Sequence, residues 1–74
     1  MNETDVMIAR TKYFFDNRIK VHITFKDDSW KNGSIIEMTS ADFFMFSDVY
    51  EGDQPIFYLQ IKEIAPYINR KVAK

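Results

Sequence analysis

Few residues in this chain have the chemistry of catalytic groups or metal ligands, and they are scattered. His22 is the only histidine and cysteine is absent, so the set of nitrogen and sulfur ligands that a zinc site needs is not available. Asp27 and Asp28 are adjacent, which is more typical of a turn than of an acid pair. Gly33 and Gly52 are isolated and do not form a phosphate-binding loop. We therefore predict no catalytic residues, no metal, no cofactor and no enzymatic activity.

The segment TSADFF, residues 39–44, is the first candidate for RNA binding. The ring of Phe43 could stack on a base, and Thr39, Ser40 and Asp42 could form hydrogen bonds to base edges. A competing interpretation is that Phe43 begins a buried strand and that the acidic surroundings repel phosphate.

A group of basic residues near the N-terminus is the second candidate. Its members are Arg10, Lys12, Arg18 and Lys20. The tail, residues 68–74, adds Arg70, Lys71 and Lys74, whereas residues 37–63 carry an excess of acids. A polyanion such as RNA would be attracted to the first region and repelled by the second. The alternative is that these charges only solvate an exposed helix face.

The elements that would position these residues follow from hydrophobic periodicity. Thr4 and Asp5 are typical of a helix start. The apolar stripe that follows, at spacings of three and four residues, predicts a helix over about residues 4–16. The members of the stripe are Met7, Ile8, Thr11, Phe14 and Phe15.

From Val21 onward, apolar and polar residues alternate, which predicts strands. The predicted strands cover residues 21–25, 30–38, 43–50 and 56–61, and a short fifth strand ends near Pro66, which cannot donate to a ladder. Gly33 lies inside the second strand, where glycine is typical of a sharp bend that lets one strand serve two sheet faces. The predicted fold class is mainly β, an N-terminal α-helix followed by a five-stranded, bent, antiparallel SH3-like barrel over about residues 19–67.

Apolar surface positions suggest partner contacts. Trp30 and Tyr58 are candidate anchors for a partner protein. The run IFYLQI strongly favours a strand, and at the barrel edge its unpaired amides would need protection or another chain. The candidate subunit interface therefore comprises Ile56, Phe57, Tyr58, Leu59 and Ile61.

These features together resemble the Sm-like (Lsm) family, whose fold is a helix followed by five bent antiparallel strands. The positions that match the first motif of that family are Val21, Ile23, Phe25, Lys26, Asp27, Gly33, Ile35, Met38, Phe44, Phe46 and Asp48. The resemblance implies a ring-forming protein whose subunits pair edge to edge. The chain departs from the family where the RNA-binding loop holds aspartate and asparagine, because Thr39 and Phe43 stand there. The Arg-Gly pair of the second motif has no counterpart in the segment YLQIKEI.

The 74 residues form one predicted domain, residues 1–74, whose core is marginal in size. A homo-oligomer, with a ring as one possibility, is therefore expected. The absence of cysteine and of a long apolar run predicts a cytoplasmic protein with no membrane contact. The first hypothesis for function is a non-enzymatic, oligomeric Sm-like protein that contacts single-stranded RNA through its basic helix face. The alternative is a small barrel that binds a protein partner and no nucleic acid.

Overall fold

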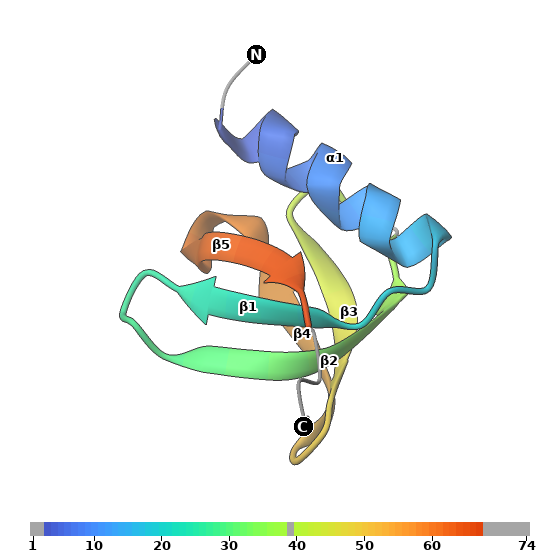
Figure 1. The fold of residues 1–74 in the computed structure, drawn as a ribbon. Coiled ribbons are helices and arrows are strands. Elements are labelled where there is room, and N and C mark those ends of the chain that lie inside the picture. The colour runs from blue at the N-terminus through green and yellow to red at the C-terminus, as the bar shows by residue number, and fades with distance from the viewer. Residues whose placement is uncertain (1–2, 39, 68–74) are drawn as a thin grey trace, which may run out of the picture.

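One helix and a five-stranded antiparallel sheet form the structure, as Figure 1 shows. The computed structural model describes residues 3–38 and 40–67. The elements are α1 (Glu3–Asp16), β1 (Val21–Phe25), β2 (Trp30–Glu37), β3 (Phe43–Asp48), β4 (Gly52–Phe57), a 3₁₀ turn η1 (Tyr58–Gln60) and β5 (Ile61–Pro66). The predicted fold class, mainly β with an N-terminal helix and a bent five-stranded barrel, is confirmed. The predicted basic tail, residues 68–74, lies outside the described residues.

The sheet has the strand order β4-β3-β2-β1-β5. Strand β2 belongs to two ladders, pairing with β1 through residues 30–33 and with β3 through residues 33–37. Gly33 is the residue that the two ladders share, opposite Val21 in one and Asp48 in the other. A Cβ at Gly33 would lie 2.0 Å from the carbonyl oxygen of Ser47, so no side chain fits there. Gly33 therefore lies where β2 passes from its pairing with β1 to its pairing with β3.

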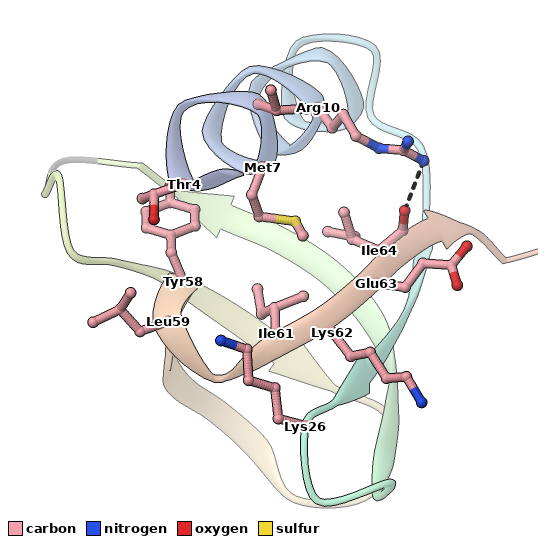
Figure 2. Close-up of a pocket in the computed structure, with 11 residues that line it drawn as sticks. Thr4, Met7, Arg10, Lys26, Tyr58, Leu59, Ile61, Lys62, Glu63 and Ile64 are labelled. Atoms are coloured by element: carbon pink, nitrogen blue, oxygen red, sulfur yellow. Dashed lines mark hydrogen bonds between the residues drawn. The ribbon is translucent and has the colours of Figure 1, made fainter. Parts of the chain in front are cut away.

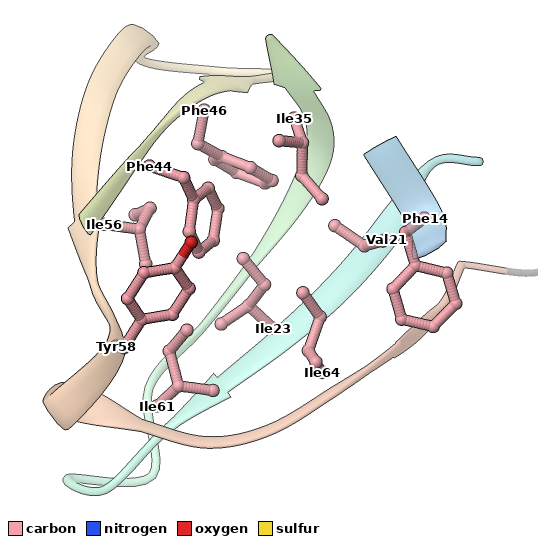
Figure 3. Close-up of a cluster of buried hydrophobic side chains, with 10 residues drawn as sticks. All are labelled: Phe14, Val21, Ile23, Ile35, Phe44, Phe46, Ile56, Tyr58, Ile61 and Ile64. Atoms are coloured by element: carbon pink, nitrogen blue, oxygen red, sulfur yellow. The ribbon is translucent and has the colours of Figure 1, made fainter. Parts of the chain in front are cut away.

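The hydrophobic core fills the space enclosed by the bent sheet, as Figure 3 shows. Alternation along each strand sends every second side chain inward. The buried cluster comprises Phe14, Val21, Ile23, Ile35, Phe44, Phe46, Ile56, Tyr58, Ile61 and Ile64. Phe14 is the member contributed by α1, so the helix covers one side of the barrel and adds one buried ring to the core.

Helix α1 follows the predicted bounds closely and carries one buried polar residue. The hydroxyl of Thr11 is fully buried and donates to the carbonyl oxygen of Met7 at 2.8 Å. The helix ends in a Schellman motif, because the Arg18 N–H donates to Phe15 and the Ile19 N–H donates to Phe14. Arg18 therefore adopts the left-handed conformation, with φ of 55°, where glycine is more usual.

The prediction of a fourth strand over IFYLQI is wrong. Strand β4 begins earlier, at Gly52, and ends at Phe57, while Tyr58–Gln60 form the turn η1 that leads into β5. Pro55 lies inside β4, opposite Met45. A proline is tolerated there because β4 is an edge strand and its nitrogen faces away from β3.

The turn from β3 to β4 is held by the carboxylate of Asp48. This buried group accepts hydrogen bonds from the N–H groups of Tyr50 at 2.7 Å and Glu51 at 2.8 Å. Burial by itself raises the pKa of Asp48, but these two hydrogen bonds and the attraction of Lys31 outweigh it and leave the pKa below its ordinary value. Glu51 also has a lowered pKa, mainly because Lys31 donates a hydrogen bond to it.

These lowered pKa values predict a loss of stability in acid. A carboxyl group whose folded-state pKa is depressed stabilises the fold above its unfolded pKa, which is about 4. That stabilisation disappears as the pH falls from the unfolded pKa through the folded-state pKa. We expect the free energy of unfolding, measured with urea, to decrease between about pH 5 and about pH 3, within the range in which such groups titrate. The Asp48→Asn variant should be less stable at neutral pH and should show a shallower decrease. An equally steep decrease in that variant would contradict the role given to Asp48.

Candidate functional site

A groove between the helix and the β5 side of the barrel has a volume of about 590 Å³. Figure 2 shows that α1 forms one wall and that η1 and β5 form the other. We call it the α1–β5 groove and define it by the residues that line it: Thr4, Val6, Met7, Arg10, Lys26, Tyr58, Leu59, Ile61, Lys62, Glu63 and Ile64.

Apolar side chains make up the floor of the α1–β5 groove. Met7 descends from the helix toward Ile61 and Ile64 in Figure 2. Leu59 and Val6 stand at the groove with 72% and 46% of their surface exposed. Exposed apolar residues gathered in one concavity are more informative than single ones scattered over a surface.

Tyr58 gives the groove an unusual polar feature. Its side chain is 3% exposed and packs on Phe44 with ring centroids 5.3 Å apart. Its hydroxyl is buried and has no hydrogen-bond partner in the described structure. Burial raises the pKa of Tyr58, so the hydroxyl stays protonated near neutral pH and remains a donor. The ring rises toward Thr4 at the first turn of α1 (Figure 2).

We expect the substitution Tyr58→Phe to stabilise the protein. A buried donor without a partner loses its hydration on folding, and removing it should raise the free energy of unfolding by about 1 to 2 kcal/mol. Thermal and urea unfolding would measure the change. The matched control is Tyr50→Phe, because Tyr50 is 87% exposed and its hydroxyl stays hydrated. A destabilised Tyr58→Phe variant would mean that the hydroxyl does make a hydrogen bond, for example to a trapped water.

Three cations border the α1–β5 groove, and their surroundings differ. The Arg10 guanidinium donates to the carbonyl oxygen of Ile64 at 3.0 Å. Lys62 forms an ion pair with Asp28 at 3.3 Å. Lys26 makes no ion pair within the described part of the chain, and its ammonium group extends past Ile61 toward Leu59 in Figure 2. The one acidic lining residue is Glu63.

The two edges of the sheet are the other candidate binding surfaces. Tyr67 N–H donates to Lys20 across the β1–β5 pair, and hydrogen-bonded pairs alternate along an antiparallel ladder. The backbone groups of Ile64 and Pro66 therefore face the outside of β5. The hydrogen bond from Arg10 to Ile64 agrees with this and occupies one outward carbonyl.

The same reasoning applies to β4. Tyr58 N–H donates to Asp42, so the backbone groups of Asp53, Pro55 and Phe57 face outward. Pro55 has no N–H, which leaves Asp53 and Phe57 as the outward donors of this edge.

The predicted RNA-binding loop is acidic and partly committed to the fold. Thr39 lies outside the described residues. Ser40 accepts a hydrogen bond from Asp42 N–H at 3.0 Å. Phe43 begins β3, as the competing interpretation held, and its ring packs against Phe57 with centroids 5.3 Å apart.

The predicted basic residues do not gather on one helix face. Arg10 points toward β5, whereas Lys12 lies about 200° around the helix from it and pairs with Asp16 at 2.9 Å. Arg18 and Lys20 follow the end of α1; both are exposed and neither forms an ion pair among the described residues.

The predicted subunit-interface residues divide into two sets. Ile56, Tyr58 and Ile61 belong to the buried core, so their side chains cannot form a contact between subunits. Phe57 and Leu59 are 44% and 72% exposed and remain available.

Trp30, the other predicted partner anchor, lies on the surface of β2. It is 56% exposed, and its ring lies 5.6 Å from that of His22. His22 is itself hydrogen-bonded to Asn32 through Nδ1 at 2.5 Å. These contacts leave more than half of the tryptophan surface available to a partner.

Sequence reasoning did not identify the α1–β5 groove. Lys26 matched a family motif, and Met7 belonged to the helical stripe, but no spacing brings these two residues together with Leu59. The one indication in the sequence was Leu59, an apolar residue beside a turn. The predicted strand over residues 56–61 included this residue instead.

Within residues 3–38 and 40–67, no group of three histidine, cysteine or acidic residues could hold a metal ion. No helix in these residues is long and apolar enough to cross a membrane. No protein-family model matches the chain, and no curated protein matches it in a sequence comparison.

Proposed function

We propose that this protein is a non-enzymatic, Sm-like barrel whose copies assemble edge to edge. The observation that carries the proposal is the strand order β4-β3-β2-β1-β5, which leaves β4 and β5 as two different open edges. Two unlike edges on one subunit allow head-to-tail pairing, which closes into a ring where the rotation permits. The helix followed by five bent strands supports the Sm-like assignment, which rests on the likeness of fold and motif.

Side chains near the edges support this assembly. Phe57 is exposed at the end of β4, and Leu59 is exposed in η1. Both residues precede β5, whose open edge adjoins the apolar α1–β5 groove. Joining two copies would remove these surfaces from water, and a 74-residue chain has a small core of its own. Pairing of another copy along the whole length of β5 requires Arg10 to release the carbonyl oxygen of Ile64.

The assembly can be tested with a pair of substitutions at one position. Phe57→Pro removes an outward N–H without touching the β3 ladder, and the φ of −88° at Phe57 lies close to the range of proline. Phe57→Ala removes the same ring but keeps the N–H. Sedimentation velocity should show a multiple of 8.8 kDa for the wild type. Phe57→Ala should also assemble, but at higher protein concentration because it lacks the ring, whereas Phe57→Pro should stay a monomer. A wild-type monomer at all concentrations would overturn the proposal, as would assembly that tolerates the proline.

RNA binding is a second candidate function, favoured by Arg18 and Lys20, which lie two residues apart, are exposed and form no ion pair among the described residues. Fluorescence anisotropy with U-rich and mixed single-stranded RNA, at low and physiological salt, tests it. Binding should weaken steeply as salt rises. The double variant Arg18→Glu, Lys20→Glu should lose binding, while Lys12→Glu, whose lysine is already paired with Asp16, should change it less. Absence of binding even at low salt would leave a barrel that contacts only protein.

A further inference from the structure

The α1–β5 groove has the dimensions of a small-molecule site. Its volume of about 590 Å³ falls within the roughly 300 to 1,000 Å³ of typical ligand pockets, which are mostly apolar with a few polar groups. The floor formed by Met7, Ile61 and Ile64 is apolar, and Leu59 extends it outward. Such a surface fits the hydrocarbon part of a small ligand.

The polar groups of the groove are nearly all donors. The hydroxyl of Tyr58 is buried and has no partner in the described structure, so an acceptor oxygen brought by a ligand would satisfy it. Arg10, Lys26 and Lys62 border the groove with positive charge against the single carboxylate of Glu63, which points away from the apolar floor in Figure 2. Lys26 has no ion pair of its own among the described residues and extends along this floor.

We infer that the α1–β5 groove binds an amphipathic anion, an apolar chain that carries one carboxylate or phosphate group. The apolar chain lies against Val6, Met7 and Leu59, over the nearly buried Ile61 and Ile64. The anionic head accepts a hydrogen bond within the groove and is attracted by Lys26. This activity goes beyond the assembly proposed above and does not require it.

Titration of the Phe57→Pro variant with decanoate tests the inference, because that variant keeps the groove and presents it on a single chain. Calorimetry would give the affinity, and amide and methyl NMR shifts would locate the site. We expect saturable binding below the micelle concentration, with the largest shifts at Met7, Leu59, Ile61 and Ile64. Decanol and decyltrimethylammonium, with the same chain, should bind at least about tenfold more weakly, since they lack the anionic head. Decyl phosphate should bind comparably to decanoate.

Two substitutions, each added to Phe57→Pro, separate the polar contributions. Tyr58→Phe should weaken decanoate binding about fivefold, the effect of one lost hydrogen bond, even though the same change is expected to stabilise the fold. Lys26→Glu should weaken it about tenfold or more because it reverses the charge at the groove. Lys12→Glu is the control, since Lys12 lies away from the groove, and should leave the affinity within about twofold.

Three results would overturn the inference. They are absence of saturable binding, shifts that map outside the groove, and equal affinity for the anionic, neutral and cationic chains. Because these measurements are made on a variant designed not to assemble, they fail or succeed independently of edge-to-edge assembly.

Discussion

The substitution Gly33→Ala is expected to destabilise the protein by at least about 3 kcal/mol, the upper end of the range for overpacking. The added Cβ would lie 2.0 Å from the backbone oxygen of Ser47 and 2.9 Å from the ring of Phe46. A side chain can rotate away, but the oxygen belongs to β3, so β2 and β3 would have to separate. Urea unfolding followed by circular dichroism would measure the loss.

The other glycine provides the control for this experiment. Gly52 has a φ of +83°, and no atom outside Gly52 and its two chain neighbours lies within 4 Å of an added Cβ, so Gly52→Ala introduces only backbone strain of about 1 kcal/mol. A combined Gly33→Ala, Phe46→Leu variant should not recover, because shortening Phe46 does not move the Ser47 oxygen. Recovery in that variant, or equal effects of the two alanines, would show that the close approach of β2 and β3 is not the reason for Gly33.

Truncation of Phe44 is expected to have the second large effect. Phe44 is 1% exposed and contacts both Phe46 and Tyr58, with ring centroids 6.3 Å and 5.3 Å away. Phe44→Ala should reduce the free energy of unfolding by about 3 to 5 kcal/mol through lost burial and the cavity that remains. A chain of 74 residues has a total stability of about 4 to 11 kcal/mol, so the variant would lose a large share of it and unfold at a clearly lower temperature.

The matched truncation is Phe57→Ala, on the opposite face of the same hairpin. Phe57 is 44% exposed and contacts Phe43 on the outside of the sheet, so its loss should reduce stability by about 1 kcal/mol or less. Thermal and urea unfolding of both variants would compare them. Similar losses at the two positions would contradict the assignment of Phe44 to the core and Phe57 to the surface.

The predictions that succeeded rest on local periodicity. The helix was expected over residues 4–16 and spans Glu3–Asp16, and β1 was expected over residues 21–25 and spans Val21–Phe25. Repeats of three to four residues and of two residues reflect the geometry of single elements, so they can be read without knowing the partner strands. The role of Gly33 was predictable for a related reason, since a glycine inside a strand usually marks a bend, a bulge or a close approach of another backbone.

The predictions that failed concern a place where two elements meet. The run Ile56–Ile61 looks like one strand, but the chain turns at Tyr58, whose ring enters the core, and then continues as β5. High strand propensity could not reveal this, because packing against Phe44 and closure of the barrel decide which residue turns inward. For the same reason three of the five predicted interface side chains are buried.

The sequence by itself determined the class of this fold, the position of the helix, the strand that serves two ladders and the unequal distribution of charge along the chain. Only the tertiary structure decided that Arg10 donates to the backbone of β5, that β4 and β5 are the open edges, and that Lys26, Tyr58 and Met7 line one groove. The physical reason is the range of the interactions. Periodicity and turn chemistry act between neighbours in the chain, whereas edges and grooves are formed by packing between residues that are distant in sequence.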